Sequence, residues 1–165
     1  MTGPAIRAAA EADIPGILAI WNPIIRDTAI TFTDEEKSPD ALARLLADRR
    51  DAGQSFLVAA AGAEVLGFAS FGQFRTGRGY RHSFEHTVLL APAARGRGVG
   101  RALMAALERE ARAAGGHTMI GGVSAENAGG FAFHAALGYR EAARLPEVGF
   151  KFGRWLDLIL MQKRL

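Results

Sequence analysis

A carboxylate and two imidazoles are the residues of this chain best suited to proton transfer. Glu85 and His86 lie in the apolar stretch SFEHTVLL, and His134 lies in ENAGGFAFHAALG. A carboxylate inside an apolar strand is costly to bury without a partner or a task, and beside a bound ammonium group it can accept the proton. From the residues alone, a solvent-facing or arginine-paired Glu85 is an equally good interpretation. A helix-surface His134 without a role is the corresponding alternative to an imidazole that donates a proton near neutral pH.

A second candidate site is a loop in which glycine and arginine alternate before an apolar-periodic segment. Glycines allow the backbone to approach an anion closely, and a helix N-terminus offers unpaired N–H groups and partial positive charge. The loop lacks the third glycine of a dinucleotide fingerprint and the Gly-Lys-Ser/Thr of a Walker loop. A plain flexible connector is the alternative to a phosphate site. The loop consists of Arg95, Gly96, Arg97, Gly98, Val99, Gly100 and Arg101.

Composition indicates an ordinary globular protein. The chain has 165 residues, 49% hydrophobic and 22% charged, which favours one domain over residues 1–165 with a sizeable core. No apolar run is long enough to cross a membrane, and Glu11 and Asp13 interrupt the only candidate signal segment. The absence of cysteine excludes disulfides, thiolate metal sites and a cysteine nucleophile. We therefore expect a cytoplasmic protein without membrane contact.

The basic residues favour a small anionic ligand over nucleic acid. The net charge is +3, and only three of the 20 basic residues are lysine, namely Lys37, Lys151 and Lys163. Arginine presents a planar fork to phosphate or carboxylate, and here the arginines are scattered and form no long stripe. The loop FRTGRGYRH over residues 74–82 could bind a carboxylate or be a solvated basic loop.

Hydrophobic periodicity predicts a mixed α/β chain with an early hairpin, one strand–helix–strand crossover and a closing pair of strands. Strands are expected at 5–10, 55–60, 65–74, 83–92, 117–124, 139–145 and 154–162, and helices at 13–25, 38–53, 99–114 and 127–138.

Local signals refine these elements. Asp13 should cap the first helix with Pro15 in its first turn, and Pro23 should end or kink it. Ser38 should cap the second helix, and Gly53 should stop it.

Faces of two elements can also be predicted. In the helix over 99–114, leucines should face inward while Glu108, Arg109 and Arg112 face solvent. In the strand, alternation places Glu85 on the side of Thr87 and Leu89, opposite His86 and Val88.

The stretch VLLAPAARGRGVGRALM resembles the acyl-CoA pyrophosphate motif of the GCN5-related N-acetyltransferases, Arg/Gln-x-x-Gly-x-Gly/Ala. Arg95, Gly98 and Gly100 occupy its fixed positions. The resemblance implies a mostly antiparallel sheet flanked by helices and splayed between its fourth and fifth strands, with acetyl-CoA as co-substrate in the gap and no metal.

Two further blocks, YRHSFEHTVLL and EVGFKFGRWLDLILMQ, are similar to the subgroup of phosphinothricin, methionine sulfoximine and L-amino acid N-acetyltransferases. The likeness extends from Ile6 to the C-terminus. It implies acetyl transfer to the primary amine of a small amino acid or analogue. Because the chain has no cysteine and no serine nucleophile motif, we expect this transfer to be direct. Two alternatives stay open. The acceptor could be another amine or a peptide N-terminus, or the protein could bind acyl-CoA without catalysis. The subgroup is usually dimeric, and WLDLILM suits either a subunit interface or a buried core.

The resemblance also implies residue roles. Glu85 is the expected base and His134 the expected proton donor to the CoA thiolate. The expected amine-binding residues are Phe32, Arg75, Thr76, Gly77, Tyr80, Arg81, Glu85, His86 and Thr87. The expected cofactor-binding residues are the loop Arg95 to Arg101 together with Val88, Leu89, Leu90 and Asn127. The backbone N–H of Leu89 or Leu90 is expected to polarise the thioester carbonyl. The subgroup commonly has Trp-Arg-Pro-Phe where this chain has Phe74-Arg75-Thr76-Gly77, so the side-chain pocket is expected to differ.

Overall fold

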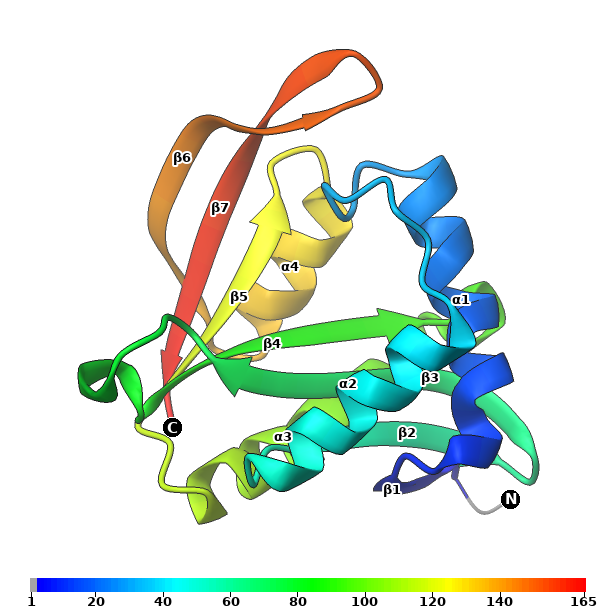
Figure 1. The fold of residues 1–165 in the computed structure, drawn as a ribbon. Coiled ribbons are helices and arrows are strands. Elements are labelled where there is room, and N and C mark those ends of the chain that lie inside the picture. Colours follow the sequence, from blue (N-terminus) through cyan, green and yellow to red (C-terminus); the bar gives the residue numbers. More distant parts are fainter. Residues whose placement is uncertain (1–2) are drawn as a thin grey trace.

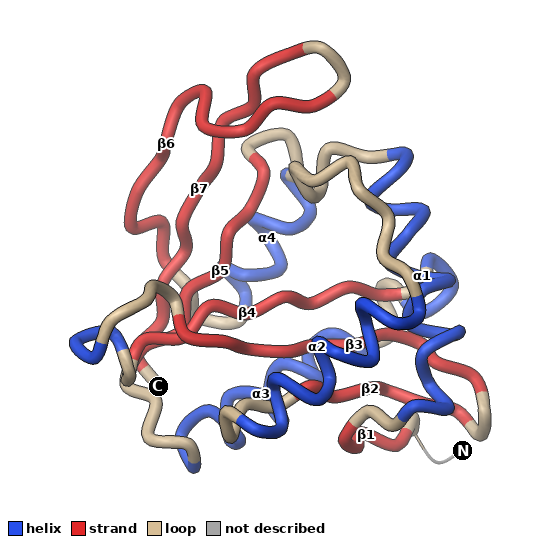
Figure 2. Tube along the Cα trace, viewed as in Figure 1, coloured by secondary structure: helices blue, strands red, loops and turns tan. Residues whose placement is uncertain are grey.

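The computed structural model describes residues 3–165 as one seven-stranded sheet with helices on both faces (Figures 1 and 2). The strand order is β1-β2-β3-β4-β5-β7-β6, and only the β4–β5 pair is parallel. The strands are β1 (Ala5–Ala8), β2 (Phe56–Ala61), β3 (Glu64–Gln73), β4 (Ser83–Leu90), β5 (Thr118–Ser124), β6 (Arg140–Lys151) and β7 (Arg154–Arg164). The helices are α1 (Ile14–Asp27), α2 (Pro39–Asp51), α3 (Val99–Ala113) and α4 (Ala128–Ala136), with short 3-10 turns η1 (Glu11–Asp13), η2 (Arg78–Tyr80) and η3 (Pro92–Ala94). The predicted fold class is confirmed.

Two apolar clusters, one on each face of the sheet, hold these elements together. Helices α1 and α2 pack on one face around Phe56 and Phe68, and α3 packs on the other around Phe71 and Phe84. Side chains from β4 enter both clusters, because alternate residues of a strand point to opposite faces. The strand thus lies at the centre of the molecule.

Pro23 was predicted to end or kink the first helix. It does not end the helix, because α1 continues through Pro23 to Asp27. Burial of Ile17, Trp21, Ile24 and Ile25 on one face of α1 explains why the last turn forms beyond the proline. For α2 the prediction is confirmed, since the Ser38 hydroxyl accepts from the Ala41 N–H and the helix ends just before Gly53.

Glu108 corrects the predicted outer face of α3. Its side chain is buried and accepts hydrogen bonds from Lys163 Nζ (2.7 Å) and the Tyr139 hydroxyl (3.1 Å), with Arg112 at 3.8 Å. The periodicity of α3 could not reveal this, because the partners come from β7 and from the segment after α4.

The closing strands are longer than predicted and form a hairpin that rises beyond β5 (Figure 1). Its turn is Phe152-Gly153, with positive φ at both residues (54° and 71°). Within WLDLILM, Leu156, Ile159 and Met161 are buried in the core, whereas Trp155 is exposed. Among residues 3–165, no helix is both long and apolar enough to cross a lipid bilayer.

Candidate active site

The β4–β5 pairing ends in the middle of the sheet, and this break creates the site. The two strands pair from Ser83↔Thr118 to His86↔Gly121 and then separate, as predicted for a sheet splayed between its fourth and fifth strands. On its other side, β4 remains paired with β3 as far as Leu90. One edge of the second half of β4 therefore faces an opening in the sheet.

The backbone direction of β4 shows which N–H groups face that opening. The Ala91 N–H donates to the Leu66 carbonyl on the β3 side (2.9 Å), and the His82 carbonyl accepts on the β5 side from Thr118 (3.2 Å). Successive residues of a strand direct their N–H groups to opposite edges. The N–H groups of Val88 and Leu90 consequently face the opening, whereas that of Leu89 faces β3.

A cavity of about 250 Å³, here called the β4 cavity, lies at the opening. Its walls come from the loop after α1 (30–32), the middle of β4 (85–89), the end of β5 (121–124) and α4. Among the predicted amine-binding residues, the structure brings Phe32, Glu85, His86 and Thr87 to this lining.

A second depression of about 520 Å³, here called the glycine-loop groove, adjoins it. Arg95, Gly96, Gly98, Gly100 and Arg101 of the predicted phosphate loop line this groove. The two depressions have five lining residues in common, namely Ile30, Val88, Leu89, Asn127 and His134. A ligand in the groove can therefore extend to a second molecule in the β4 cavity.

The glycine loop has the geometry that anion binding requires. Gly98 is the N-cap of α3 with φ of 79°, which a residue with a side chain adopts only under strain. The first backbone bond of the helix runs from Ala102 to Gly98, so the N–H groups of Val99, Gly100 and Arg101 have no partner within the helix. Val99 itself is buried in the core, and the Arg97 guanidinium turns back to the Ala93 carbonyl (3.4 Å).

Glu85 is a carboxylate in a concave and partly desolvated environment. Its side chain is accessible to solvent, but it lies on the wall of a concave site with Gly122 of β5 opposite. Burial raises the pKa of the Glu85 carboxyl above its usual range. No hydrogen bond or ion pair to this carboxylate occurs among residues 3–165, so the arginine-paired alternative does not describe it.

His86 and His134 form a buried pair beneath the two depressions. Their Nε2 atoms are 2.9 Å apart, and His134 Nδ1 lies 2.7 Å from the Gly130 carbonyl. A carbonyl only accepts, so Nδ1 of His134 carries a proton. When both rings are neutral, His86 Nε2–H donates to His134 Nε2. The tautomer of each ring is thus fixed by its neighbours.

Both imidazoles favour the neutral state. Burial, and then the effect of charge on His134, lowers the pKa of His86 to about 3, and burial lowers the pKa of His134 below its usual value. His86 Nδ1 is buried and has no hydrogen-bond partner in the described part of the chain. The Tyr139 ring packs against both histidines, with each ring centroid 5.4 Å away.

Asn127 is the N-cap of α4. Its Oδ1 accepts from the Gly130 N–H at 2.9 Å, which fixes the start of α4 beside both depressions. Asn127 belongs to the wall common to the β4 cavity and the glycine-loop groove.

The arginine-rich loop does not reach the lining of the β4 cavity. Arg75, Thr76, Gly77, Tyr80 and Arg81 are exposed or partly exposed around η2, and none of them lines the cavity. Arg75 lies over the Tyr80 ring at 6.0 Å, and Arg81 donates to the Arg78 carbonyl at 3.0 Å. Their role toward a ligand stays a prediction.

Sequence reasoning missed Gly121 and Gly122, which line the β4 cavity from β5. A Cβ atom at Gly121 would lie 2.8 Å from the His86 ring and 3.1 Å from the His134 ring. Two glycines inside a strand signal close approach, and that signal was present in TMIGGVS. Across residues 3–165, no three His, Cys, Asp or Glu side chains gather as a metal site would require.

Comparison with known proteins agrees with this geometry. Residues 21–139 match the Acetyltransferase (GNAT) family. An L-methionine sulfoximine/L-methionine sulfone acetyltransferase from Salmonella typhimurium is 39% identical over 160 residues, covering 97% of this chain and 94% of the relative.

Solved structures give the same result. A crystal structure of a ribosomal-protein-alanine N-acetyltransferase from Brucella melitensis has a TM-score of 0.94 and 43% identity, covering 98% of this chain and 99% of that one. A putative acetyltransferase from Salmonella typhimurium, solved with its cofactor acetyl-CoA, has a TM-score of 0.94 and 38% identity, covering 99% and 95%.

A splayed mixed sheet with a glycine-rich loop at the mouth of α3 defines an acyl-CoA-dependent transferase. The chain belongs to the GNAT family of acetyltransferases, and it is an N-acetyltransferase.

Proposed function

We propose that the protein transfers the acetyl group of acetyl-CoA to the α-amine of a free amino acid or analogue, in the class of methionine sulfoximine, methionine sulfone and phosphinothricin. One observation carries this proposal: the β4 cavity, with Glu85 on its wall, is continuous with the glycine-loop groove at the break in the sheet. The names of the relatives and the acetyl-CoA in a solved structure support the same donor and the same class of acceptor.

Acetyl-CoA occupies the glycine-loop groove in this proposal. The unpaired N–H groups at the start of α3 bind its pyrophosphate, with Arg95 and Arg101 beside them. Arg97 and Val99 complete the loop. Asn127 and the free edge of β4, from Val88 to Leu90, face the arm that carries the thioester.

Glu85 removes the proton from the substrate ammonium, so that the nitrogen lone pair attacks the thioester carbon directly. The N–H groups of Val88 and Leu90 face the opening, so they replace Leu89 as candidates to stabilise the negative charge on the carbonyl oxygen. The amide bond forms as the carbon–sulfur bond breaks, and the products are an N-acetyl amine and CoA.

His134 is the proposed proton donor to the CoA thiolate. Its neutral ring accepts at Nε2 and its Nδ1–H is held by Gly130, so donation requires the doubly protonated ring. The nitrogen of the ammonium loses two protons as it becomes an amide: Glu85 accepts the first, the second passes to solvent as the tetrahedral intermediate collapses, and the His134 imidazolium gives its own proton to the CoA thiolate. This role predicts an alkaline limb in the pH profile of kcat/KM that His134→Gln abolishes.

Replacement of the base gives the most direct test of the chemistry. Glu85→Gln should lower kcat by about 100- to 10,000-fold at neutral pH, because the amide cannot accept the proton. Binding of acetyl-CoA, measured by calorimetry, should be unchanged, since Glu85 lies outside the glycine-loop groove. Full turnover in Glu85→Gln would instead favour a different base, or activation by solvent alone.

The amine itself requires a substrate panel. Methionine sulfoximine, methionine sulfone, phosphinothricin and ordinary amino acids are offered with acetyl-CoA, and release of free thiol is followed. We expect turnover with members of this class, with Phe32, His86 and Thr87 bordering the side chain in the β4 cavity. Arg75 and Arg81, with Thr76, Gly77 and Tyr80 around them, are proposed to attract the substrate carboxylate.

A peptide N-terminus is the second candidate acceptor, because the similar Brucella protein is named for the alanine of a ribosomal protein. Peptides with an N-terminal alanine belong in the same panel. Turnover only with these peptides would replace the amino acid proposal. Binding of acetyl-CoA without any acceptor would favour a binding protein without catalysis.

We also propose that the chain is a single domain, acts in the cytoplasm without nucleic acid or membrane partners, and forms a homodimer. The exposed apolar side chains of the β6–β7 hairpin, Val148, Phe150, Phe152 and Trp155, support an interface there. Trp155→Arg should convert the dimer to a monomer in light scattering, because a charge replaces the most exposed aromatic residue. An unchanged mass would place the interface elsewhere.

A further inference from the structure

The block VGFKFGRWLD, residues 148–157, has contacts that the proposed chemistry does not use. It forms the tip of the β6–β7 hairpin, and three of its residues, Gly149, Lys151 and Arg154, contact segments on either side of the β4 cavity. A fourth, Asp157, binds the backbone of the hairpin itself.

Asp157 shapes the base of the tip. The β6–β7 register shifts between Leu145 and Gly149, and Glu147 there has φ of 53°. The Asp157 carboxylate accepts from the Glu147 N–H at 2.9 Å, which satisfies the backbone at this bulge. A bulge bends a hairpin, and in Figure 1 the tip leans toward the loop after α1.

Lys151 connects the tip to that loop. Its side chain is 3% exposed, and Nζ donates to the carbonyls of Thr28 (2.6 Å) and Thr31 (2.8 Å). Burial lowers the pKa of the Lys151 amine from its usual value. A buried amine bound to two loop carbonyls fixes the backbone immediately before Phe32.

Gly149 supplies the second contact. The Phe32 ring lies so close to this glycine that any Cβ atom would overlap it. Phe32, Thr31 and Ile30 are the part of the loop that lines the β4 cavity. The ring therefore has its position because residue 149 has no side chain.

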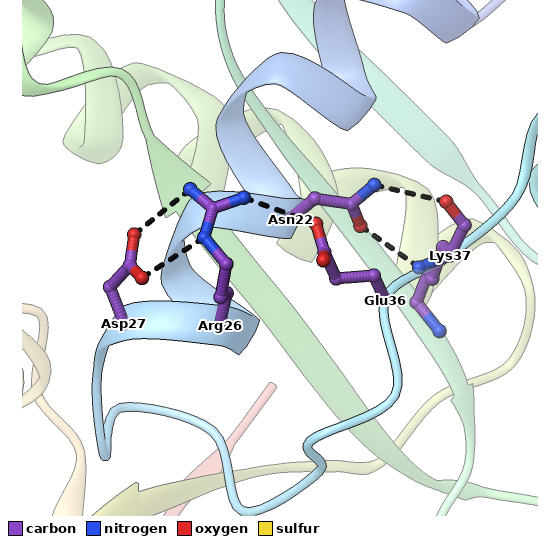
Figure 3. Close-up of polar contacts among 5 residues, drawn as sticks. All are labelled: Asn22, Arg26, Asp27, Glu36 and Lys37. Carbon is purple, nitrogen blue, oxygen red and sulfur yellow. Dashed lines mark hydrogen bonds and ion pairs between the residues drawn. The ribbon is translucent and has the colours of Figure 1, made fainter.

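The other end of the loop is held by α1 rather than by the hairpin. Asn22 Nδ2 donates to the Lys37 carbonyl (3.0 Å), and the Lys37 N–H donates to Asn22 Oδ1 (2.9 Å), as Figure 3 shows. Arg26 adds an ion pair to Glu36 at 3.3 Å. Between these two attachments, Thr28 and Ile30 are also held from the α1 side, so the hairpin acts on the position of Thr31 and Phe32.

On the opposite side, Arg154 reaches Glu126, with Nη2 and Oε1 3.0 Å apart. Glu126 precedes Asn127, which belongs to the wall common to both depressions. The hairpin tip thus contacts segments on both sides of the opening. This opening exists because β4 and β5 are not paired beyond His86 and Gly121.

We propose that the tip of the β6–β7 hairpin determines the affinity for the amine, with Gly149 and Lys151 as positioning residues that hold Phe32 and its neighbours against the β4 cavity. This inference rests on the proposed function, because it assigns the amine to that cavity. It predicts that damage at the tip affects amine binding and leaves acetyl-CoA binding intact.

A double-mutant cycle tests the Gly149 part. Gly149→Ala should raise KM for methionine sulfoximine by roughly tenfold or more, because the new methyl group displaces the ring. The dissociation constant for acetyl-CoA should stay within about twofold. In a Phe32→Ala background the same substitution should have almost no further effect on KM. Equal effects in both backgrounds, or an unchanged KM, overturn the proposal.

Lys151→Met tests the other contact, and Lys37→Met is its matched control. Lys37 belongs to the same loop but binds Asn22 through its backbone, which the substitution leaves intact. Hydrogen exchange of residues 28–33 should accelerate in Lys151→Met and not in Lys37→Met. An unchanged exchange rate in Lys151→Met overturns the proposal.

The exchange measurement needs no substrate, so it separates two kinds of failure. If no amino acid is acetylated by the unmodified protein, the proposed function fails, while faster exchange would still show that Lys151 holds the loop. If amino acids are acetylated and neither variant changes KM, only the positioning role fails.

Discussion

Individual side chains in this site are oriented mainly by backbone groups. Lys151 binds two loop carbonyls, His134 binds the Gly130 carbonyl, and Asn127 binds the Gly130 N–H. Backbone positions within one fold vary little, so these bonds fix the geometry at low entropic cost. Glu85 has no such partner, which leaves its carboxylate free to exchange protons.

Thr31 allows the energetic cost of a buried hydroxyl without a hydrogen-bond partner to be measured. Its Oγ1 makes no hydrogen bond within residues 3–165. Thr31→Val should therefore raise the free energy of unfolding by about 1 kcal/mol, because it removes an unsatisfied hydroxyl. Urea unfolding measures the change.

Thr28→Val is the matched control for that experiment. The Thr28 hydroxyl donates to the Ile24 carbonyl (2.7 Å) and accepts from the Ile30 N–H (3.2 Å). Its loss should lower the free energy of unfolding. Equal changes in the two variants would contradict the assignment of their different environments.

The buried His86 predicts a pH dependence of stability. Its pKa falls from a usual 6.5 to about 3, so between these pH values the unfolded chain binds the proton and the folded chain does not. Stability from this group is complete above pH 6.5 and decreases as the pH falls toward 3, with a slope of up to about 1.4 kcal/mol per pH unit.

His86→Leu should lower the slope of the unfolding free energy against pH by about 1.4 kcal/mol per pH unit, the value for one proton. Urea unfolding at a series of pH values measures this slope. The prediction fails if the slopes of His86→Leu and the unmodified protein coincide.

At the scale of elements, sequence patterns correctly predicted the features that are determined by residues close together in the sequence. The order of strands and helices, the Ser38 cap and the loop before α3 all follow from local signals. The continuation of α1 past Pro23 and the burial of Glu108 do not, because both depend on partners from distant segments. The hairpin tip over the β4 cavity likewise depends on a bulge that period-two alternation does not encode.

Gly100 links the glycine loop to α4. A Cβ atom there would lie 3.1 Å from the Phe133 ring and 3.2 Å from Leu90. Gly100→Ala should destabilise the protein by about 1 kcal/mol and weaken acetyl-CoA binding, because α3 must move away from α4. Calorimetric titration gives the affinity, and thermal unfolding gives the stability.

Adding Phe133→Leu to that variant should restore part of both losses, because the smaller side chain makes room for the methyl group. If the double variant is no better than Gly100→Ala alone, the crowding is with Leu90 or the backbone instead.

At the scale of the whole molecule, the two apolar clusters meet on the same strands. Side chains from β2, β3 and β4 enter both clusters, so neither face can lose its packing alone. We expect one cooperative transition in urea, with coincident curves from tryptophan fluorescence and circular dichroism. Two separate transitions would contradict a single domain.

The contact between Phe32 and Gly149 has a consequence for how such enzymes diverge. The side chains at positions 32 and 149 compete for the same space, although the two positions are far apart in the sequence. A lineage that acquires a side chain at position 149 must accept a smaller one at position 32, or lose the wall of its cavity. Across an alignment of relatives, we expect these two positions to change together, and a library that varies both at once to yield new acceptor preferences that single substitutions miss.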